Sequence, residues 1–287
     1  MADSRMATVE GARVAYRIHD NGALIVLVNG TAALDVHWGP VIPALAKQRT
    51  VLTLDYSGSG ETTDDGSTLS LQKLANQVIG LAKAAGLDRF DLVGHSLGVA
   101  VAIQVAAAVP DLVRSITAVA GFAHGSGPRL ELQFQLWLDL LRTTRMAFLR
   151  LLLLSGLTPT FVSRLGVSVL EDMINEYLPL ANWDGIKRQV ELDLTVDIRE
   201  KTTKIRSPSL VINCTHDQIV TQTSGLAASI PNSTLRQLNV GHLAYFECGD
   251  EFLALITDFQ SRRELSTPAG RRNPPVLTDG ASGSTRN

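Results

Sequence analysis

The sequence predicts an α/β protein with a mostly parallel central sheet, flanking helices and an inserted helical cap. Short apolar runs alternate with longer helical patterns through most of the 287 residues. Several runs are apolar on both faces, as in strands that lie buried beneath helices on each side. The alternation breaks once, from about residue 124 to 187, where leucine-rich helical sequence continues without a strand. This break predicts the cap.

The elements follow from these patterns in chain order. A mixed polar and apolar run after a turn at Gly11 predicts an outer strand at 13–18. The apolar runs predict further strands at 24–28, 51–55, 91–93, 115–120, 210–214 and 235–240. Helices are expected at 41–47, 69–85, 97–109, 224–229 and 251–262, where Gly86 and Pro110 stop two of them.

This order of elements predicts a discontinuous core. We expect residues 1–123 and 188–262 to form the α/β core and residues 124–187 to form the cap or lid. Residues 263–287 are rich in Pro, Gly, Ser, Thr and Arg, and have few apolar groups to bury. They are therefore expected to form a disordered tail.

Composition narrows the class of protein. The chain carries 26 Lys and Arg against 28 Asp and Glu, a net charge of −2, which argues against a nucleic-acid partner. No basic segment followed by an apolar one opens the chain, so a cytoplasmic location with free thiols at Cys214 and Cys248 is expected. The apolar stretch at 149–157 is far shorter than the ~20 residues of a membrane span.

The strongest motif is Gly94-His95-Ser96-Leu97-Gly98, between an apolar strand and an alanine-rich helix. A G-x-S-x-G sequence in this setting predicts a sharp, strained turn with an exposed serine hydroxyl, and its glycines avoid steric collision. Ser96 is therefore the candidate nucleophile. His95 occupies the variable position of the motif, and we interpret it as a packed structural residue.

A serine nucleophile needs an imidazole to take its proton and a carboxylate to orient that imidazole. In this architecture the three residues follow in the order serine, acid, histidine. Asp217 follows the strand at 210–214, and His242, the one histidine beyond it, follows the strand at 235–240. The other strand end considered, after 115–120, carries no carboxylate. Asp217 and His242 are the predicted acid and base.

Acyl transfer also needs donors for the developing oxyanion. The backbone N–H of Leu97, directly after the candidate nucleophile, is the first predicted donor. The second is the backbone N–H of Thr31, in the Asn29-Gly30-Thr31-Ala32 loop after strand 24–28, where Gly30 permits a close approach.

Taken together, these motifs resemble those of the α/β-hydrolase fold family from about Val9 to Gln260. The segment from Asp55 to Gly60 is similar to the D-x-x-G-x-G loop of that family, whereas Asn29 stands where many relatives have histidine. The resemblance implies a serine hydrolase that cleaves an ester, thioester or lactone of a hydrophobic small molecule.

The resemblance also suggests which residues meet the substrate. We expect contacts from Asn29 and Gly30, from Trp137 in the cap, and from His124, which could instead lie in a surface loop. No cofactor and no metal site are expected. Two alternatives stay open: a non-hydrolytic, C–C bond-cleaving or cyclising reaction on the same residues, and a ligand receptor that retains them.

Overall fold

A computed structural model describes residues 2–19, 22–85 and 89–266 and confirms the α/β class. Its eight-stranded sheet runs in the order β1-β2-β4-β3-β5-β6-β7-β8. β1 pairs antiparallel with β2, and β2 pairs antiparallel with β4. The remaining strands, from β3 to β8 in the chain, are mutually parallel. The strands are β1 (Arg5–Val9), β2 (Ala12–His19), β3 (Ala23–Val28), β4 (Arg49–Asp55), β5 (Phe90–His95), β6 (Val113–Val119), β7 (Ser209–Cys214) and β8 (Ser233–Leu238).

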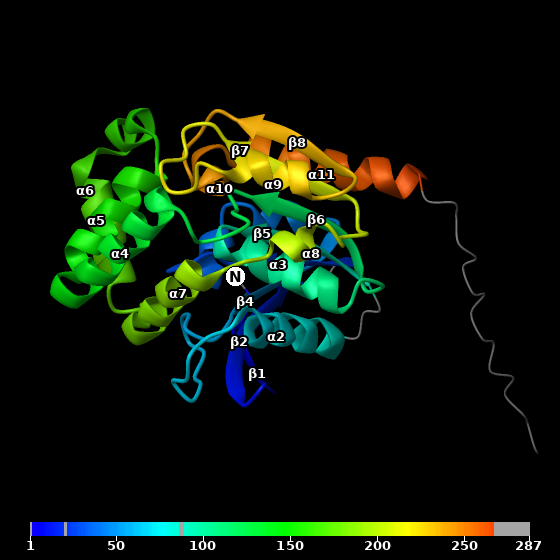
Figure 1. Ribbon diagram of the computed structural model, residues 1–287, viewed down its shortest axis with the longest axis horizontal. Coiled ribbons are helices and arrows are strands. Elements are labelled where there is room, and N and C mark those ends of the chain that lie inside the picture. Colours follow the sequence, from blue (N-terminus) through cyan, green and yellow to red (C-terminus); the bar gives the residue numbers. More distant parts are fainter. Residues whose placement is uncertain (1, 20–21, 86–88, 267–287) are drawn as a thin grey trace, which may run out of the picture.

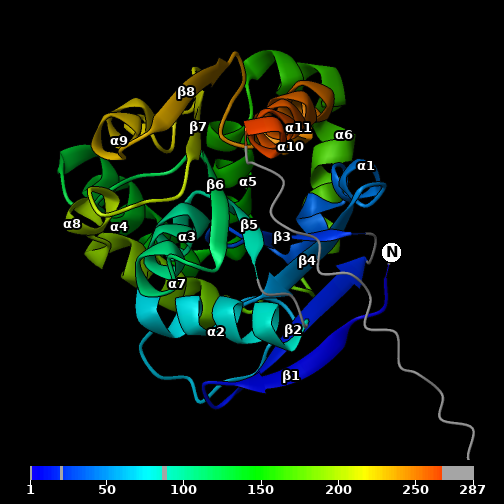
Figure 2. The ribbon, with the colours of Figure 1, turned by 90° about the vertical axis from the view of Figure 1, so that its right-hand side faces the viewer.

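Helices cover both faces of this sheet. In Figure 2, α2 and α3 lie on one side of the strands, and α1 and α11 lie on the other. The core helices are η1 (Asp35–Trp38), α1 (Ile42–Leu45), α2 (Leu71–Ala84), α3 (Leu97–Ala108), α8 (Arg199–Thr202), α9 (Thr223–Ser229), α10 (Ala244–Glu247) and α11 (Gly249–Ser266).

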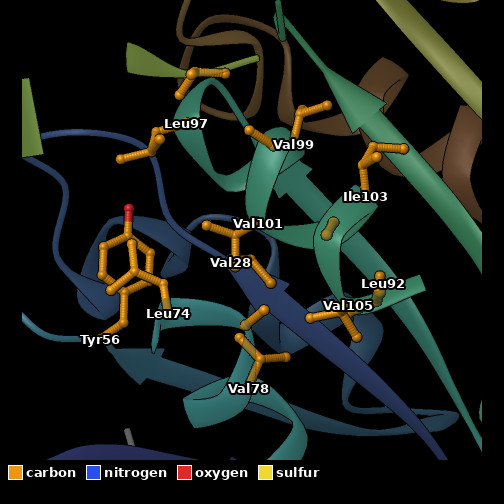
Figure 3. Packing of buried hydrophobic residues seen from close by; sticks show 14 of the residues in the cluster. Val28, Tyr56, Leu74, Val78, Leu92, Leu97, Val99, Val101, Ile103 and Val105 are labelled. Carbon is orange, nitrogen blue, oxygen red and sulfur yellow. The ribbon is translucent and has the colours of Figure 1, made fainter. Parts of the chain in front are cut away.

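The strands divide the apolar core into two clusters because successive side chains point to opposite faces. In β3, Leu24, Val26 and Val28 join the cluster beneath α2 and α3, whereas Ile25 and Leu27 join the cluster beneath α1 and α11. Figure 3 shows the first cluster, with side chains of α3 packed against the sheet. The continuous apolar runs in the sequence thus reflect burial on both faces.

Several boundaries differ from the predicted ones. β1 was not expected, because its residues are mostly exposed and it is held mainly by pairing with β2 across a turn where Glu10 and Gly11 both have positive φ. The helix predicted at 41–47 is shorter, α1 at Ile42–Leu45, and a 3-10 turn that was not predicted, η1, precedes it at Asp35–Trp38. Helix α11 continues to Ser266, past the predicted core boundary at 262, and the rest of the predicted tail, 267–287, lies outside the described residues. Both cysteines are free thiols.

Helices alone fill the insertion between β6 and β7 in the described chain. α4 (Pro128–Thr143), α5 (Arg145–Gly156) and α6 (Pro159–Tyr177) form the green lobe in Figure 1, and α7 (Trp183–Thr195) leads back to the core. The predicted cap boundary at 187/188 falls inside α7.

Helix α7 is joined closely to the core. A Cβ at Gly185 would lie 2.3 Å from the carbonyl oxygen of Gly58, in the loop after β4, so the two backbones touch with no side chain between them. None of the described helices is long and apolar enough to cross a membrane.

The turn between β5 and α3 generates a stability prediction. A Cβ at Gly98 would lie 2.2 Å from the backbone oxygen of Val28, so Gly98→Ala should destabilise the fold by about 3 kcal/mol or more. A Cβ at Gly225 in α9 would meet nothing within 4 Å. Gly225→Ala should therefore be as stable as the wild type or more stable, because alanine favours the helix. Thermal unfolding of both variants tests this, and equal melting temperatures would contradict it.

Candidate active site

Ser96 occupies the sharp turn between β5 and α3. Its backbone, at φ 54° and ψ −120°, lies in a region that non-glycine residues rarely adopt. The Ser96 N–H donates to the Val119 carbonyl at 3.0 Å, which ties the turn to β6. A Cβ at Gly94 would lie 2.4 Å from the Gly98 oxygen, so both motif glycines are steric requirements.

Asp217 and His242 lie on the loops after β7 and β8 and contact each other. His242 Nδ1 lies 2.7 Å from Asp217 Oδ2, while Asp217 Oδ1 accepts from the N–H groups of Ile219 at 2.8 Å and Val220 at 2.9 Å. Both carboxylate oxygens are therefore fixed. The contact through Nδ1 leaves His242 Nε2 as the nitrogen available to a hydroxyl.

His95 supports the same loop. Its Nε2 lies 3.0 Å from the carbonyl oxygen of His242, which identifies Nε2–H as the donor, and the two rings have centroids 4.6 Å apart. Burial, followed by the nearby His242, holds the pKa of His95 well below its usual range. A neutral His95 therefore anchors the backbone of His242, which agrees with a packed structural role.

Ser96 and His242 line one pocket. Within the described residues no hydrogen bond joins the Ser96 hydroxyl to His242, as is common where such a bond tightens only with substrate bound. Their shared position fits a proton transfer between them once a ligand fills the pocket.

The loop after β3 passes beside Ser96. A Cβ at Gly30 would lie 2.9 Å from the Cβ of Ser96, so Gly30 allows the close approach that the sequence predicts. Leu97 opens α3, and its N–H precedes the first bonds within the helix. In the described chain no backbone carbonyl accepts from the Thr31 N–H. Neither N–H group therefore has a backbone acceptor in the described chain.

Two predicted substrate contacts differ from the structure. Asn29 is 1% exposed and absent from the pocket wall, because its Nδ2 donates to the Leu54 carbonyl at 3.1 Å and its Oδ1 accepts from Trp38 Nε1 at 2.6 Å. The amide thus supports the loop. His124 is also absent from the wall: its backbone bridges to Asp197 and its ring contacts Ser126.

The pocket has a volume of about 290 Å³ and lies between the sheet edge and the inserted helices. Trp137 lines it as expected, and Gly30 lies behind Ser96 rather than on the wall. Its wall contains no Asp, Glu, Lys or Arg among the described residues. Most of the wall is apolar or aromatic, including Leu149, Leu152, Leu153, Ile174, Ile219, Leu243, Tyr245 and Phe246.

Some wall residues carried no signal in the sequence. His37 accepts the Leu34 N–H at Nδ1 at 3.1 Å and stacks on Tyr177, with centroids 5.7 Å apart. Burial lowers the pKa of His37 to about 4, so the ring is neutral near pH 7. His37 lies in η1 and Tyr177 in α6, and no local pattern joins two such distant positions.

Behind the wall, Asp193 of α7 is 1% exposed and accepts one hydrogen bond, from the Thr31 hydroxyl to Oδ2 at 2.6 Å. Asp193 Oδ1 has no partner in the described chain. Burial raises the pKa of Asp193 to about 8. This buried carboxyl group, with one oxygen lacking a hydrogen bond, is therefore mostly neutral at pH 7.

This raised pKa predicts a pH effect on stability. The folded protein binds the Asp193 proton more tightly than the unfolded chain does. The protonated carboxyl group therefore contributes fully to the free energy of unfolding below about pH 4, and this contribution is lost as pH rises through about 8. Asparagine does not titrate in this range. The melting temperature of Asp193→Asn relative to that of the wild type should therefore rise from pH 5 to pH 9. Exposed Asp139→Asn is the matched control, and a constant difference for Asp193→Asn would contradict the assignment.

The chain belongs to the α/β-hydrolase fold family, whose model matches residues 23–247. It is similar to the pyrrolizixenacetamide deacetylase of Xenorhabdus hominickii, at 43% identity over 254 residues, 88% of this chain and 96% of the relative. It is also 28% identical to a putative carbamate hydrolase of Azorhizobium caulinodans over 80% of this chain and 88% of that one.

Solved structures agree with this assignment. The enol-lactonase of Burkholderia xenovorans superposes with a TM-score of 0.80 at 25% identity, over 90% of this chain and all of that one. A hydrolase from a deep-sea metagenome gives a TM-score of 0.83 at 20% identity, over 95% and 100% of the two chains, which shows the fold. The protein is thus an enzyme of the α/β-hydrolase class.

Proposed function

We propose that this enzyme is a serine hydrolase that cleaves an acyl bond of an uncharged, hydrophobic small molecule. The observation that carries the proposal is the Asp217–His242 pair beside the strained turn of Ser96, at one apolar pocket. Esters, thioesters and lactones fit this chemistry. The name of the 43%-identical deacetylase adds amides that carry a small acyl group.

In the proposed mechanism, His242 Nε2 takes the proton of Ser96 as Oγ attacks the acyl carbon. The negative charge that develops on the carbonyl oxygen is stabilised by the N–H groups of Leu97 and Thr31. His242 returns its proton to the leaving oxygen, sulfur or nitrogen. A water molecule then attacks the acyl-enzyme with His242 as base, and Ser96 is regenerated. Asp217 keeps the imidazole oriented throughout.

The pocket wall supports an uncharged substrate. A charged group buried there would lose its hydration with no opposite charge to replace it, at a cost of several kcal/mol. Apolar groups gain about 0.8 kcal/mol for each CH₂ that leaves water. We therefore propose that the leucine-rich surface of α5 and the side chains of α6 receive the hydrophobic part of the substrate.

A fluorophosphonate probe tests the nucleophile. We expect a single modified serine, Ser96, by peptide mass spectrometry, because only a serine beside a base becomes this reactive. Ser96→Ala should abolish labelling and lower kcat for an ester by about 10³-fold or more with folding intact. Exposed Ser126→Ala should label normally. Labelling that survives in Ser96→Ala would refute the assignment.

A matched pair of esters tests the substrate class. Compared with 2-naphthyl acetate, its 6-carboxylate derivative should show a kcat/KM at least about tenfold lower, because the pocket offers no cation. Leu153→Arg adds a cation to the wall and should reduce the difference in kcat/KM between the two esters. Equal turnover of both esters by the wild type would argue against the proposed class, and no ester turnover at all would favour the non-hydrolytic or receptor alternatives.

A further inference from the structure

Three hydrogen bonds join the loop after β3 to the inserted helices. The Thr31 hydroxyl donates to Asp193 Oδ2 at 2.6 Å, and the Ala32 N–H donates to Gln189 Oε1 at 3.0 Å. The Tyr177 hydroxyl donates to the Ala32 carbonyl at 2.6 Å. These three partners of Thr31 and Ala32 come from α6 and α7, more than 140 positions along the chain.

The loop needs these partners. Ala32 has φ 57°, a left-handed conformation that costs a non-glycine residue about 1 kcal/mol. Outside the sheet, its N–H and carbonyl have no strand ladder to hold them. Gln189 and Tyr177 bond both groups, so they stabilise the backbone turn that sets the direction of the preceding Thr31 N–H.

The surroundings of Gln189 hold its side chain in the orientation that this contact needs. Its side chain is fully buried, and its Nε2 donates to Ser59 Oγ at 2.8 Å, which fixes the amide with Oε1 toward Ala32. The backbone contact between Gly58 and Gly185 brings the same helix close to the core. Gln189 therefore holds the loop through a rigid support rather than through a mobile surface residue.

Asp193 adds a constraint on charge. A carboxylate behind Thr31 would place negative charge close to the oxygen that becomes negative in the proposed reaction, and the two charges would repel. The neutral carboxyl accepts the Thr31 hydroxyl without this repulsion. The raised pKa of about 8 keeps the group mostly neutral at pH 7.

We propose that Gln189 and Asp193 are positioning residues of the oxyanion hole: they hold the Thr31–Ala32 loop so that the Thr31 N–H faces the developing oxyanion. This inference rests on the proposed function. It assigns to α7, inside the inserted segment, a part in catalysis as well as in covering the pocket.

The first test compares two glutamines with the same bonding. Gln77 is also fully buried, and it accepts the Ser57 N–H and donates to the Ser57 hydroxyl, away from the pocket. Gln189→Met should lower kcat for 2-naphthyl acetate about 10- to 100-fold with KM within about threefold. Gln77→Met should lose similar thermal stability and keep its kcat.

A second measurement separates positioning from general damage. A trifluoromethyl ketone forms a serine adduct with an oxyanion, whereas the matched methyl ketone does so poorly. Gln189→Met should weaken the first inhibitor in proportion to its loss of kcat/KM and leave the second unchanged. Tyr177→Phe removes one hydroxyl on α6 and should weaken the trifluoromethyl ketone to a smaller extent. This variant replaces Gln189→Met in the test if Gln189→Met does not fold.

The pH profile tests Asp193. Wild-type kcat should fall above about pH 8 as Asp193 ionises, and Asp193→Asn should lack this fall. Asp55 lies near Tyr56 and Tyr177, and burial raises its pKa to about 7, below the expected fall, so its ionisation is common to the wild type and Asp193→Asn. Further titratable groups around the loop are Tyr56, Tyr177, His37 and His95. Burial raises the pKa of both tyrosines and lowers that of both histidines, so these four stay neutral between pH 7 and pH 9.

The outcomes are distinct. Normal kcat in Gln189→Met, or an unchanged alkaline fall in Asp193→Asn, would overturn the corresponding assignment while Ser96-dependent turnover remained. Absence of Ser96-dependent turnover in the wild type would overturn the proposed function itself.

Discussion

The backbone conformation of Ser96 is the constraint on which the rest of the site depends. A non-glycine residue at φ 54° is unfavourable on its own, and the turn exists because Gly94 and Gly98 let β5, α3 and the end of β3 approach without side chains between them. The hydrogen bond from the Ser96 N–H to Val119 holds the turn against β6. The large buried core on both faces of the sheet offsets the strain of this turn.

The parallel strands explain why distant residues meet at this turn. The carboxyl ends of β3, β5, β7 and β8 lie on one edge of the sheet, so the loops that carry Thr31, Ser96, Asp217 and His242 converge there. Around them, hydrogen bonds from His95 and from the Ile219 and Val220 amides fix the imidazole and the carboxylate in place. The inserted helices close the other side with an apolar wall.

Sequence patterns were sufficient where the signal is local. The central strands could be predicted because each is apolar on both faces, and Ser96, Asp217 and His242 could be predicted to lie near one another because each follows a parallel strand. β1 gave no such signal, since its residues are mostly exposed. The surroundings of Asn29 could not be foreseen either, because Trp38 and Leu54 satisfy its amide across the fold. Gln189 and Asp193 were missed for the same reason: their partners lie about 160 residues away.

The contact between Gly58 and Gly185 has a practical consequence for chimeras. Because the two backbones touch, the start of α7 cannot be exchanged for a helix with a side chain at that position unless the loop after β4 changes too. A graft that replaces the insertion to alter substrate range is therefore better joined in the short linker between α6 and α7. Such a graft keeps α7 with the native α/β core and exchanges only α4, α5 and α6, which form part of the pocket wall.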